Sequence, residues 1–145
     1  MSVKSFFTDL QQKAILDAIE KAEKNTSGEI RVHLEAKCKI DPTKRAIEVF
    51  EKLQMHQTEL RNGILFYLAS DDKKFAVIGD TGINNVVPKN FWDSIKDGII
   101  SNFKNGKFAE GLIEGIYLTG EKLVAHFPHQ ENDVNELSND ISFGE

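Results

Sequence analysis

Apolar residues recur at helical spacing in four parts of the chain. The pattern predicts amphipathic helices over residues 8–25, 42–55, 88–103 and 108–127. Thr8 and Gln11 form a capping box at the start of the first helix. Gly111 and Gly115 lie four residues apart in the last helix, so we expect another backbone to approach it closely there.

Three segments have the pattern of β-strands. Residues 29–37 alternate between apolar and polar positions, which predicts a strand with one buried face and one solvent-exposed face. The exposed face would carry Arg31, His33, Glu35 and Lys37. Residues 64–69 are continuously apolar, as is typical of a central strand covered on both faces. Residues 74–79 follow after a short turn and predict the third strand.

The connections between these segments predict how the sheet is built. A helix joins the first two strands, so they should be parallel with a right-handed crossover. The short turn makes the second and third strands antiparallel neighbours. We therefore expect an α/β fold, a three-layer αβα sandwich with a small mixed sheet and helices on both faces. A single domain would span residues 1–127, followed by an acidic tail over 128–145 with few apolar side chains available to dock: Val134, Leu137, Ile141 and Phe143.

The charge of the chain is concentrated in that tail. The net charge is −5, and the tail carries five acidic residues and no Lys or Arg, so the body is neutral. A neutral body argues against binding to nucleic acid. No segment approaches the about 20 apolar residues of a membrane span, and the N-terminus lacks a signal-peptide pattern, so we expect no direct membrane insertion. The single cysteine agrees with a cytoplasmic location.

The candidate metal-binding residues lie in and around the run Gly-Asp-Thr-Gly-Ile-Asn-Asn at residues 79–85. Because the third strand runs opposite to the first two, its end should bring Asp80 close to Glu29 and Glu59. Asn84 and Asp93 can reach the same edge from the next helix. Ca²⁺ takes roughly 6–8 oxygen ligands in flexible geometry, so these residues could hold Ca²⁺ or another divalent cation such as Mg²⁺. The same run also fits a plain structured turn in which Asp80 is only a cap.

Other reactive side chains give weaker patterns. Cys38 follows the first strand, but a cysteine phosphatase needs arginine six residues later and that position holds Lys44. We expect Cys38 to be inert packing. The histidines have no zinc-site spacing, and His33 and His56 are expected to be solvated or to cap other groups.

Several short motifs together resemble the TPM domain family. They are Thr-Ser-Gly-Glu-Ile-Arg-Val at 26–32, Arg-Asn-Gly-Ile-Leu-Phe-Tyr at 61–67, Gly-Asp-Thr-Gly-Ile at 79–83 and Phe-Lys-Asn-Gly-Lys-Phe-Ala-Glu-Gly-Leu at 103–112. The resemblance covers about residues 8–127. It implies an αβα sandwich that binds a divalent metal, commonly Ca²⁺, at the glycine-rich loop. In plant thylakoid members it also implies acid phosphatase activity and a role in photosystem repair. Glu29 and Asp80 lie within the matched motifs.

The leading prediction is a stand-alone, soluble TPM-like domain that binds Ca²⁺ or a similar divalent cation. The ion would order the surrounding loops, as in a metal-responsive regulatory module. The alternative is a weak metal-dependent acid phosphatase in which a metal-activated water attacks, since no nucleophile is visible in the sequence. A third interpretation is an interaction module that contacts an unidentified protein through its acidic tail or a helix face.

Overall fold

The computed structural model describes residues 3–129 and 136–144. The elements, in chain order, are η1 (Val3–Ser5), α1 (Asp9–Glu23), β1 (Glu29–Glu35), α2 (Pro42–Lys52), η2 (Met55–Gln57), β2 (Gly63–Ala69), β3 (Lys74–Gly79), α3 (Thr81–Asn84), α4 (Asp93–Lys104), α5 (Phe108–Leu123) and β4 (Ser142–Phe143). The four strands form one sheet with the order β3-β2-β1-β4. The predicted α/β class and mixed sheet are confirmed.

Strand directions follow from the connections, as predicted. β1 and β2 are parallel, and Glu29 lies opposite Gly63. β2 and β3 are antiparallel, and Ile64 lies opposite Gly79. The end of β3 therefore lies beside the starts of β1 and β2, which places Asp80 and Glu29 at one end of the sheet.

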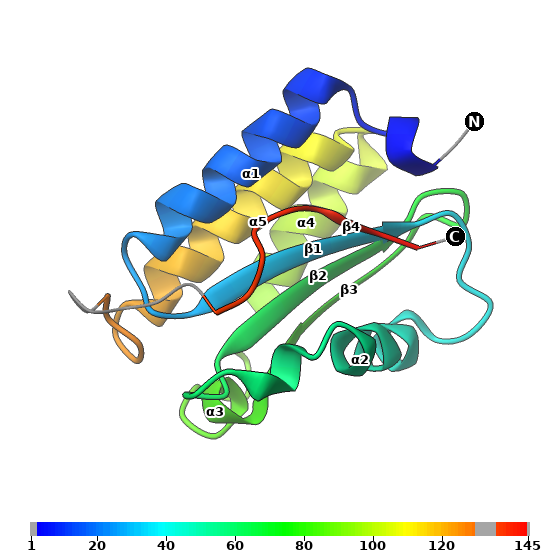
Figure 1. Cartoon of the computed structure of the whole chain (residues 1–145). Coiled ribbons are helices and arrows are strands. Elements are labelled where there is room, and N and C mark those ends of the chain that lie inside the picture. The colour runs from blue at the N-terminus through cyan, green and yellow to red at the C-terminus, as the bar shows by residue number, and fades with distance from the viewer. Residues whose placement is uncertain (1–2, 130–135, 145) are drawn as a thin grey trace.

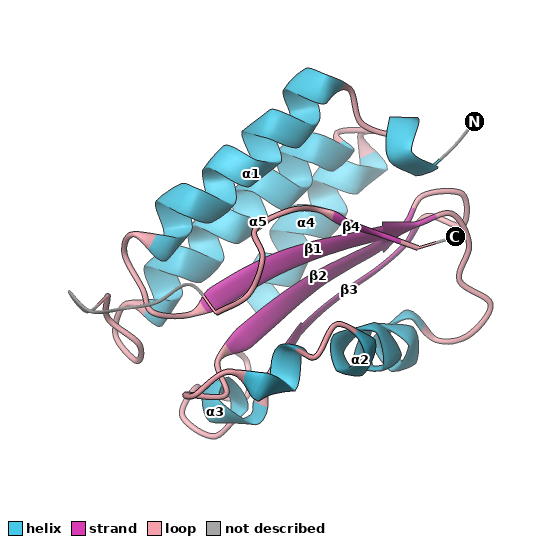
Figure 2. Cartoon of the chain, in the orientation of Figure 1, coloured by secondary structure: helices cyan, strands magenta, loops and turns pink. Residues whose placement is uncertain are grey.

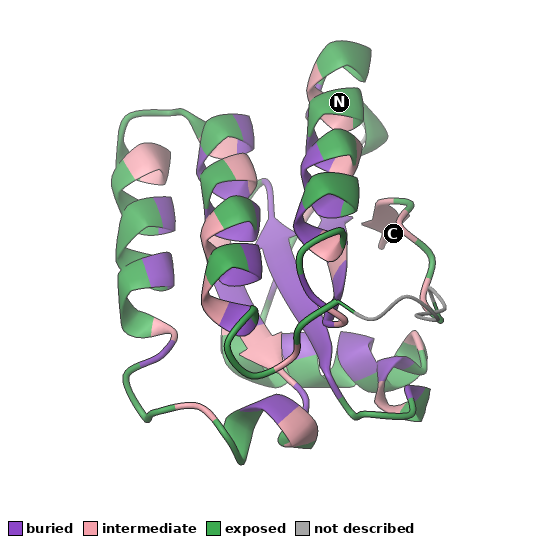
Figure 3. Cartoon of the chain, turned by 90° about the vertical axis from the view of Figure 1, so that its left-hand side faces the viewer, coloured by how far each residue is buried: buried purple, intermediate pink, exposed green. Residues whose placement is uncertain are grey.

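The sheet lies between two layers of helices (Figures 1 and 2). α1, α4 and α5 cover one face, where the larger core contains the apolar side chains of alternate strand positions such as Ile30, Phe66 and Val77. α2 covers the other face, where a smaller core includes Tyr67 and Phe50. Figure 3 shows that the buried residues of the helices lie on their inner sides. The helices thus turn one apolar stripe to the sheet, as the sequence periodicity requires.

Two of the three glycines of α5, Gly111 and Gly115, lie in close contact with side chains of α4. A Cβ atom on Gly115 would lie 2.5 Å from Cδ1 of Ile99 in α4, and one on Gly111 would lie 2.9 Å from the ring of Phe103. Glycine allows α4 and α5 to approach closely, which offsets the unfavourable helix propensity of these positions.

The prediction of a solvent-exposed face on the first strand is wrong. His33 and Glu35 are buried, and Arg31 is only partly exposed. Arg45 of α2 reaches Glu35 from one side, and the C-terminal segment places Ser142 against His33. His33 and Glu35 thus find hydrogen-bond partners inside the protein, so their polarity does not require contact with water.

Two local predictions around the glycine-rich run are also corrected. Residues 81–84 form the single helical turn α3, which Asp80 caps, instead of a loop. The helix expected from residue 88 begins only at Asp93. The amide of Phe91 donates to the carbonyl of Pro88, and the amide of Asp93 donates to that of Asn90, so tight turns occupy this stretch.

The C-terminal segment contributes a strand that the sequence pattern did not predict. Ser142 and Phe143 pair in parallel with His33 and Leu34 of β1. Three of the apolar residues noted in the tail, Leu137, Ile141 and Phe143, pack against the cores. Val134 lies outside the described residues. Within the described part of the chain, no helix is long and apolar enough to cross a membrane.

Candidate functional site

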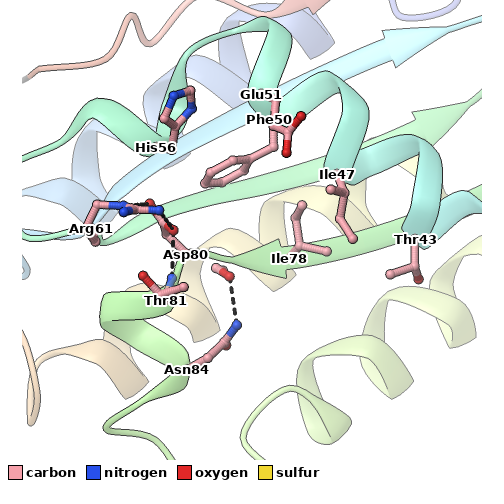
Figure 4. Close-up of a pocket in the computed structure, with 11 residues that line it drawn as sticks. Thr43, Ile47, Phe50, Glu51, His56, Arg61, Ile78, Asp80, Thr81 and Asn84 are labelled. Atoms are coloured by element: carbon pink, nitrogen blue, oxygen red, sulfur yellow. Dashed lines mark hydrogen bonds and ion pairs between the residues drawn. The ribbon is translucent and has the colours of Figure 1, made fainter.

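A cavity of about 700 Å³ opens between α2 and the C-terminal end of β3 (Figure 4). Apolar side chains of α2 and β3 form one wall, and polar groups of α3 and the segment before β2 form the other. The lining residues are Thr43, Ile47, Phe50, Glu51, His56, Arg61, Ile78, Gly79, Asp80, Thr81 and Asn84. The cavity thus lies at the glycine-rich run that the sequence singled out.

Asp80 is the buried acid of this cavity and is only 6% exposed. Its Oδ1 accepts a hydrogen bond from the amide of Thr81 at 2.7 Å, which caps α3. Arg61 donates two hydrogen bonds to the same carboxylate, from Nε to Oδ2 at 2.8 Å and from Nη2 to Oδ1 at 2.9 Å. Hydrogen bonds to Asp80 raise the pKa of Arg61. Asp80 is therefore a paired anion with both oxygens engaged.

The backbone before β2 positions Arg61. Arg61 has φ of 50°, in the left-handed region that costs most side chains energy. The amide of Gly82 donates to the Arg61 carbonyl at 2.9 Å, which ties this turn to α3. The side chain of Arg61 remains 48% exposed, so its ion pair with Asp80 lies at the mouth of the cavity and is open to water.

Asn84 lies on the same side of the cavity as Asp80 and Thr81 (Figure 4). Its Nδ2 donates to the carbonyl oxygen of Gly79 at 2.9 Å, and its Oδ1 accepts from Nε1 of Trp92 at 3.4 Å. The second contact is long and therefore weak. The structure thus brings Asp80 and Asn84 together, as predicted.

Glu29 lies on the same face of the sheet as Asp80 but on a strand two positions away. Between them, a Cβ atom on Gly63 would lie 3.2 Å from the Met55 carbonyl and 3.6 Å from Leu137, so protein atoms fill this space. Oε1 of Glu29 accepts the amide of Leu137 at 2.7 Å. Burial raises the pKa of Glu29 to about 7, which the nearby charge of Glu136 reinforces against hydrogen bonds that lower it.

The remaining predicted ligands lie outside the cavity. The side chains of Glu59 and Asp93 are exposed and do not line it. The amide of Glu59 donates to the carboxylate of Glu136. Within residues 3–129 and 136–144, no group of three or more His, Cys, Asp or Glu side chains is placed to hold a metal ion.

Three cavity residues were missed as site residues from the sequence: Arg61, His56 and Glu51. Arg61 stands in the motif at 61–67, but nothing in the pattern indicates that it folds back onto Asp80. His56 was expected to be solvated or capping, yet its Nδ1 is buried without a hydrogen-bond partner among the described atoms. Cys38 is buried, in agreement with the expected packing role.

A second acid near Glu29 makes stability depend on pH. Burial raises the pKa of Glu23, at the end of α1, to about 7, against the opposing hydrogen bond from the amide of Ile30. A raised pKa means that the folded state holds this proton more tightly. The contribution of Glu23 is thus fully present below pH 4.5 and is lost as the pH rises through about 7.

We expect Glu23→Gln to increase the free energy of unfolding at pH 8 by about 1–2 kcal/mol, because the variant buries no charge. At pH 4 the wild type is protonated and the difference should vanish. Denaturant unfolding at both pH values measures this. Glu121→Gln, at an exposed position of α5, is the control and should show no such pH-dependent gain. Equal effects of Glu23→Gln at both pH values would contradict the assignment.

The layers and the cavity define a small αβα domain with a buried acid beside an open cavity at one end of the sheet. The family model of the TPM domain matches residues 3–122, and the chain belongs to this family. The NMR structure of BA42 protein from the psychrophilic bacterium Bizionia argentinensis is 49% identical, with 99% of each chain covered and a TM-score of 0.92.

Two more distant solved structures share the fold. The N-terminal domain of a P. gingivalis protein is 19% identical, with a TM-score of 0.69 and coverage of 87% of this chain and 82% of that one. The N-terminal domain of the cg2496 protein from Corynebacterium glutamicum is 11% identical, with a TM-score of 0.67 and coverage of 97% and 82%. No curated protein matches this chain.

Proposed function

We propose that this TPM domain binds a divalent cation, preferably Ca²⁺, in the cavity at Asp80, and that the ion orders the surrounding loops. The observation that carries the proposal is a buried carboxylate whose one cationic partner among the described residues, Arg61, has an exposed side chain. The positive charge that Asp80 requires is thus supplied from the open side of the cavity, where an ion in solution can compete for it.

The donor chemistry of the cavity agrees with a hard cation. Asp80 offers a carboxylate, Thr81 a hydroxyl group and Asn84 an amide oxygen, and all three line the same space. Oxygen ligands of these kinds are those that Ca²⁺ prefers. Few of them are charged, so we expect weak binding, with Kd on the order of 0.1–1 mM. Glu29 does not line this space, because Met55 and Leu137 pack at Gly63 between it and Asp80, so the proposed ligand set does not include it.

The ion would act by displacing Arg61. An ion pair that is open to water contributes little to stability, so a divalent cation can replace the guanidinium at Asp80 at small cost. Release of Arg61 would change the segment before β2, because the left-handed conformation of Arg61 is held between Asp80 and Gly82. This gives the domain a metal-dependent change in one loop, as a metal-responsive regulatory module requires.

A calcium titration followed by thermal unfolding tests the proposal. At about ten times Kd, Ca²⁺ should raise Tm by roughly 2–5 °C, because it binds only the native state. Asp80→Asn keeps a cap for α3 but loses the charge, so the rise should disappear. Arg61→Met removes the competing guanidinium, so it should respond at lower Ca²⁺ concentrations than the wild type does.

Asp93→Asn is the matched control, because Asp93 is an exposed acid outside the cavity. Its response should equal that of the wild type. A full calcium response in Asp80→Asn would refute the proposal. Loss of the response in Asp93→Asn would move the site to the start of α4.

Metal-dependent phosphatase activity is the second candidate. Its support is that Arg61 and His56 line the same cavity as Asp80, so groups able to bind a phosphate oxygen lie beside the proposed metal ligand. Turnover of p-nitrophenyl phosphate that requires the metal and is absent from Asp80→Asn would support it. Activity that is independent of metal, or that separates from the protein on purification, would refute it.

A further inference from the structure

A second cavity, of about 600 Å³, lies at the opposite end of the sheet from Asp80. It is formed by the turn between β2 and β3, the start of β3, the end of α4 and the start of α5. Figure 1 shows that this turn and the α4–α5 connection are far from α3. The cavity is therefore independent of the proposed metal site.

The floor of this cavity is aromatic. Phe103 of α4 packs edge-on against Phe75 of β3, with ring centroids 5.5 Å apart, and lies 4.9 Å from the ring of Phe108 in α5. All three rings are only partly buried against the core. Ile100 extends the apolar surface and is 43% exposed. Covering these groups would remove apolar area from water, which is favourable at roughly 25 cal/mol per Å².

The charged groups that line the cavity are both lysines, Lys73 and Lys104, and none of its lining residues carries a carboxylate. Nζ of Lys73 lies 4.8 Å from the centroid of the Phe108 ring and 5.2 Å from that of Phe6. Such cation–π contacts hold the ammonium group over the apolar surface. The next residue, Lys74, instead donates to the carbonyl of Cys38, away from this cavity.

The backbone of Lys73 has an unusual conformation. Its φ is 55°, a left-handed conformation that costs a side-chain-bearing residue about 1 kcal/mol or more. The turn after β2 thus places a strained residue with its ammonium group over the aromatic floor. A strained residue beside a cavity suggests a binding role that can be tested.

We propose that this cavity binds a small amphiphilic anion, with an apolar chain or ring over Phe75, Phe103 and Phe108 and a single carboxylate or similar head group at Lys73 and Lys104. The volume agrees with small-ligand sites, which occupy about 300–1,000 Å³. The occupant is a free molecule and not a bilayer surface. Stable attraction to anionic lipid needs clusters of roughly 4–8 basic residues, and this chain is acidic overall.

Titration with sodium decanoate below micelle formation, in calcium-free buffer with a chelator, tests the proposal by amide NMR and calorimetry. We expect saturable binding with one site and Kd on the order of 0.1–1 mM. The shifted amides should cluster at residues 73–75 and 100–108. Decyltrimethylammonium, which has the same chain with a cationic head, should bind at least about tenfold more weakly because the lysines repel it.

Two variants separate the head-group and chain contacts. The double variant Lys73→Met and Lys104→Met should weaken decanoate binding roughly tenfold, and Ile100→Ser at its exposed position should weaken both amphiphiles. Lys89→Met with Lys96→Met, at exposed positions elsewhere, is the matched control and should bind as the wild type does.

Three results of the titrations would overturn the proposal: equal binding of both amphiphiles, unchanged affinity in the Lys73 and Lys104 variant, or shifts that centre on Asp80. Sedimentation with vesicles of phosphatidylcholine and phosphatidylglycerol supplies a further arm. Vesicle binding without a response to monomeric decanoate would assign this surface to a membrane and refute the free ligand. Because all arms use calcium-free protein, failure here leaves the calcium proposal unaffected.

Discussion

Gly82→Ala is expected to destabilise the domain by about 3 kcal/mol or more. A Cβ atom on Gly82 would lie 2.1 Å from the carbonyl oxygen of Leu60 and 2.5 Å from that of Arg61. Both contacts are with backbone atoms, so a change of side-chain rotamer cannot relieve them. The turn before β2 would have to move away from α3, and the hydrogen bond from the Gly82 amide to Arg61 would be lost with it.

Gly98→Ala is the matched control, because an added Cβ atom there meets nothing within 4 Å. Gly98 lies inside α4, so alanine should stabilise the protein by about 0.5–1 kcal/mol. Denaturant unfolding followed by circular dichroism compares the two variants directly. Wild-type stability in Gly82→Ala would show that the close approach of α3 to the preceding turn is not maintained in solution.

This contact also explains why the glycine-rich run is so tight. Gly82 lies in the run that also fitted a structured turn, where glycine would be expected to supply a left-handed backbone conformation. The structure gives a different reason, namely that α3 packs directly on the backbone at residues 60–61. Such a contact joins segments about twenty residues apart and leaves no periodic pattern in the sequence.

The parts of the fold that were predicted correctly depend on local information. Helix and strand periodicity located the main elements, and connection lengths determined the strand directions. The prediction of an exposed face on the first strand was wrong because the periodicity of a sequence shows which residues are polar and does not show which are exposed to solvent. His33 and Glu35 are polar and buried at once, since Arg45 and the C-terminal segment supply their partners from distant parts of the chain.

The candidate site was predicted only in part for a similar reason. Strand direction correctly placed Asp80 and Glu29 at the same end of the sheet. It could not show that Met55 and Leu137 occupy the space at Gly63 between them. Nor could it show that Arg61, in a left-handed conformation, folds onto Asp80. The sequence thus predicts which strand ends lie close together, but it does not predict which side chains touch there.

Glu35→Gln is expected to cost about 3–5 kcal/mol of folding free energy, because it breaks a buried charge cluster. Glu35 is 3% exposed and accepts from Nε of Arg45 at 2.8 Å, from Nη2 of Arg45 at 2.9 Å and from the hydroxyl of Tyr67. His33 Nε2 lies 3.2 Å from Oε1 of the same carboxylate. The uncharged amide group of the variant could not replace a carboxylate as the partner of Arg45. Glu48→Gln removes only the exposed partner of Arg45 and should cost at most about 0.5 kcal/mol.

The pH dependence of this effect has a definite sign. Burial alone would raise the pKa of Glu35, but hydrogen bonds from Arg45, Tyr67 and His33 together lower it to about 2. A lowered pKa contributes stability that is fully present above pH 4.5 and is lost as the pH falls through about 2. The wild type should therefore lose this contribution in acid, whereas Glu35→Gln has none to lose. Chemical unfolding at pH 7 and pH 3 would show the two curves converging; parallel curves would contradict the role of the charge.

The same substitution should loosen the C-terminal strand. His33 links Glu35 to Ser142 in β4, and a Cβ atom on Gly144 would lie 2.5 Å from Oε1 of Glu35. The amide of Gly144 donates to the Leu34 carbonyl at 2.7 Å, so its hydrogen exchange reports on this attachment. We expect exchange at Gly144 to accelerate in Glu35→Gln but not in Glu48→Gln. Unchanged exchange would mean that backbone pairing alone holds β4. The polar cluster around Glu35 would then stabilise the packing of α2 and have no effect on the edge of the sheet.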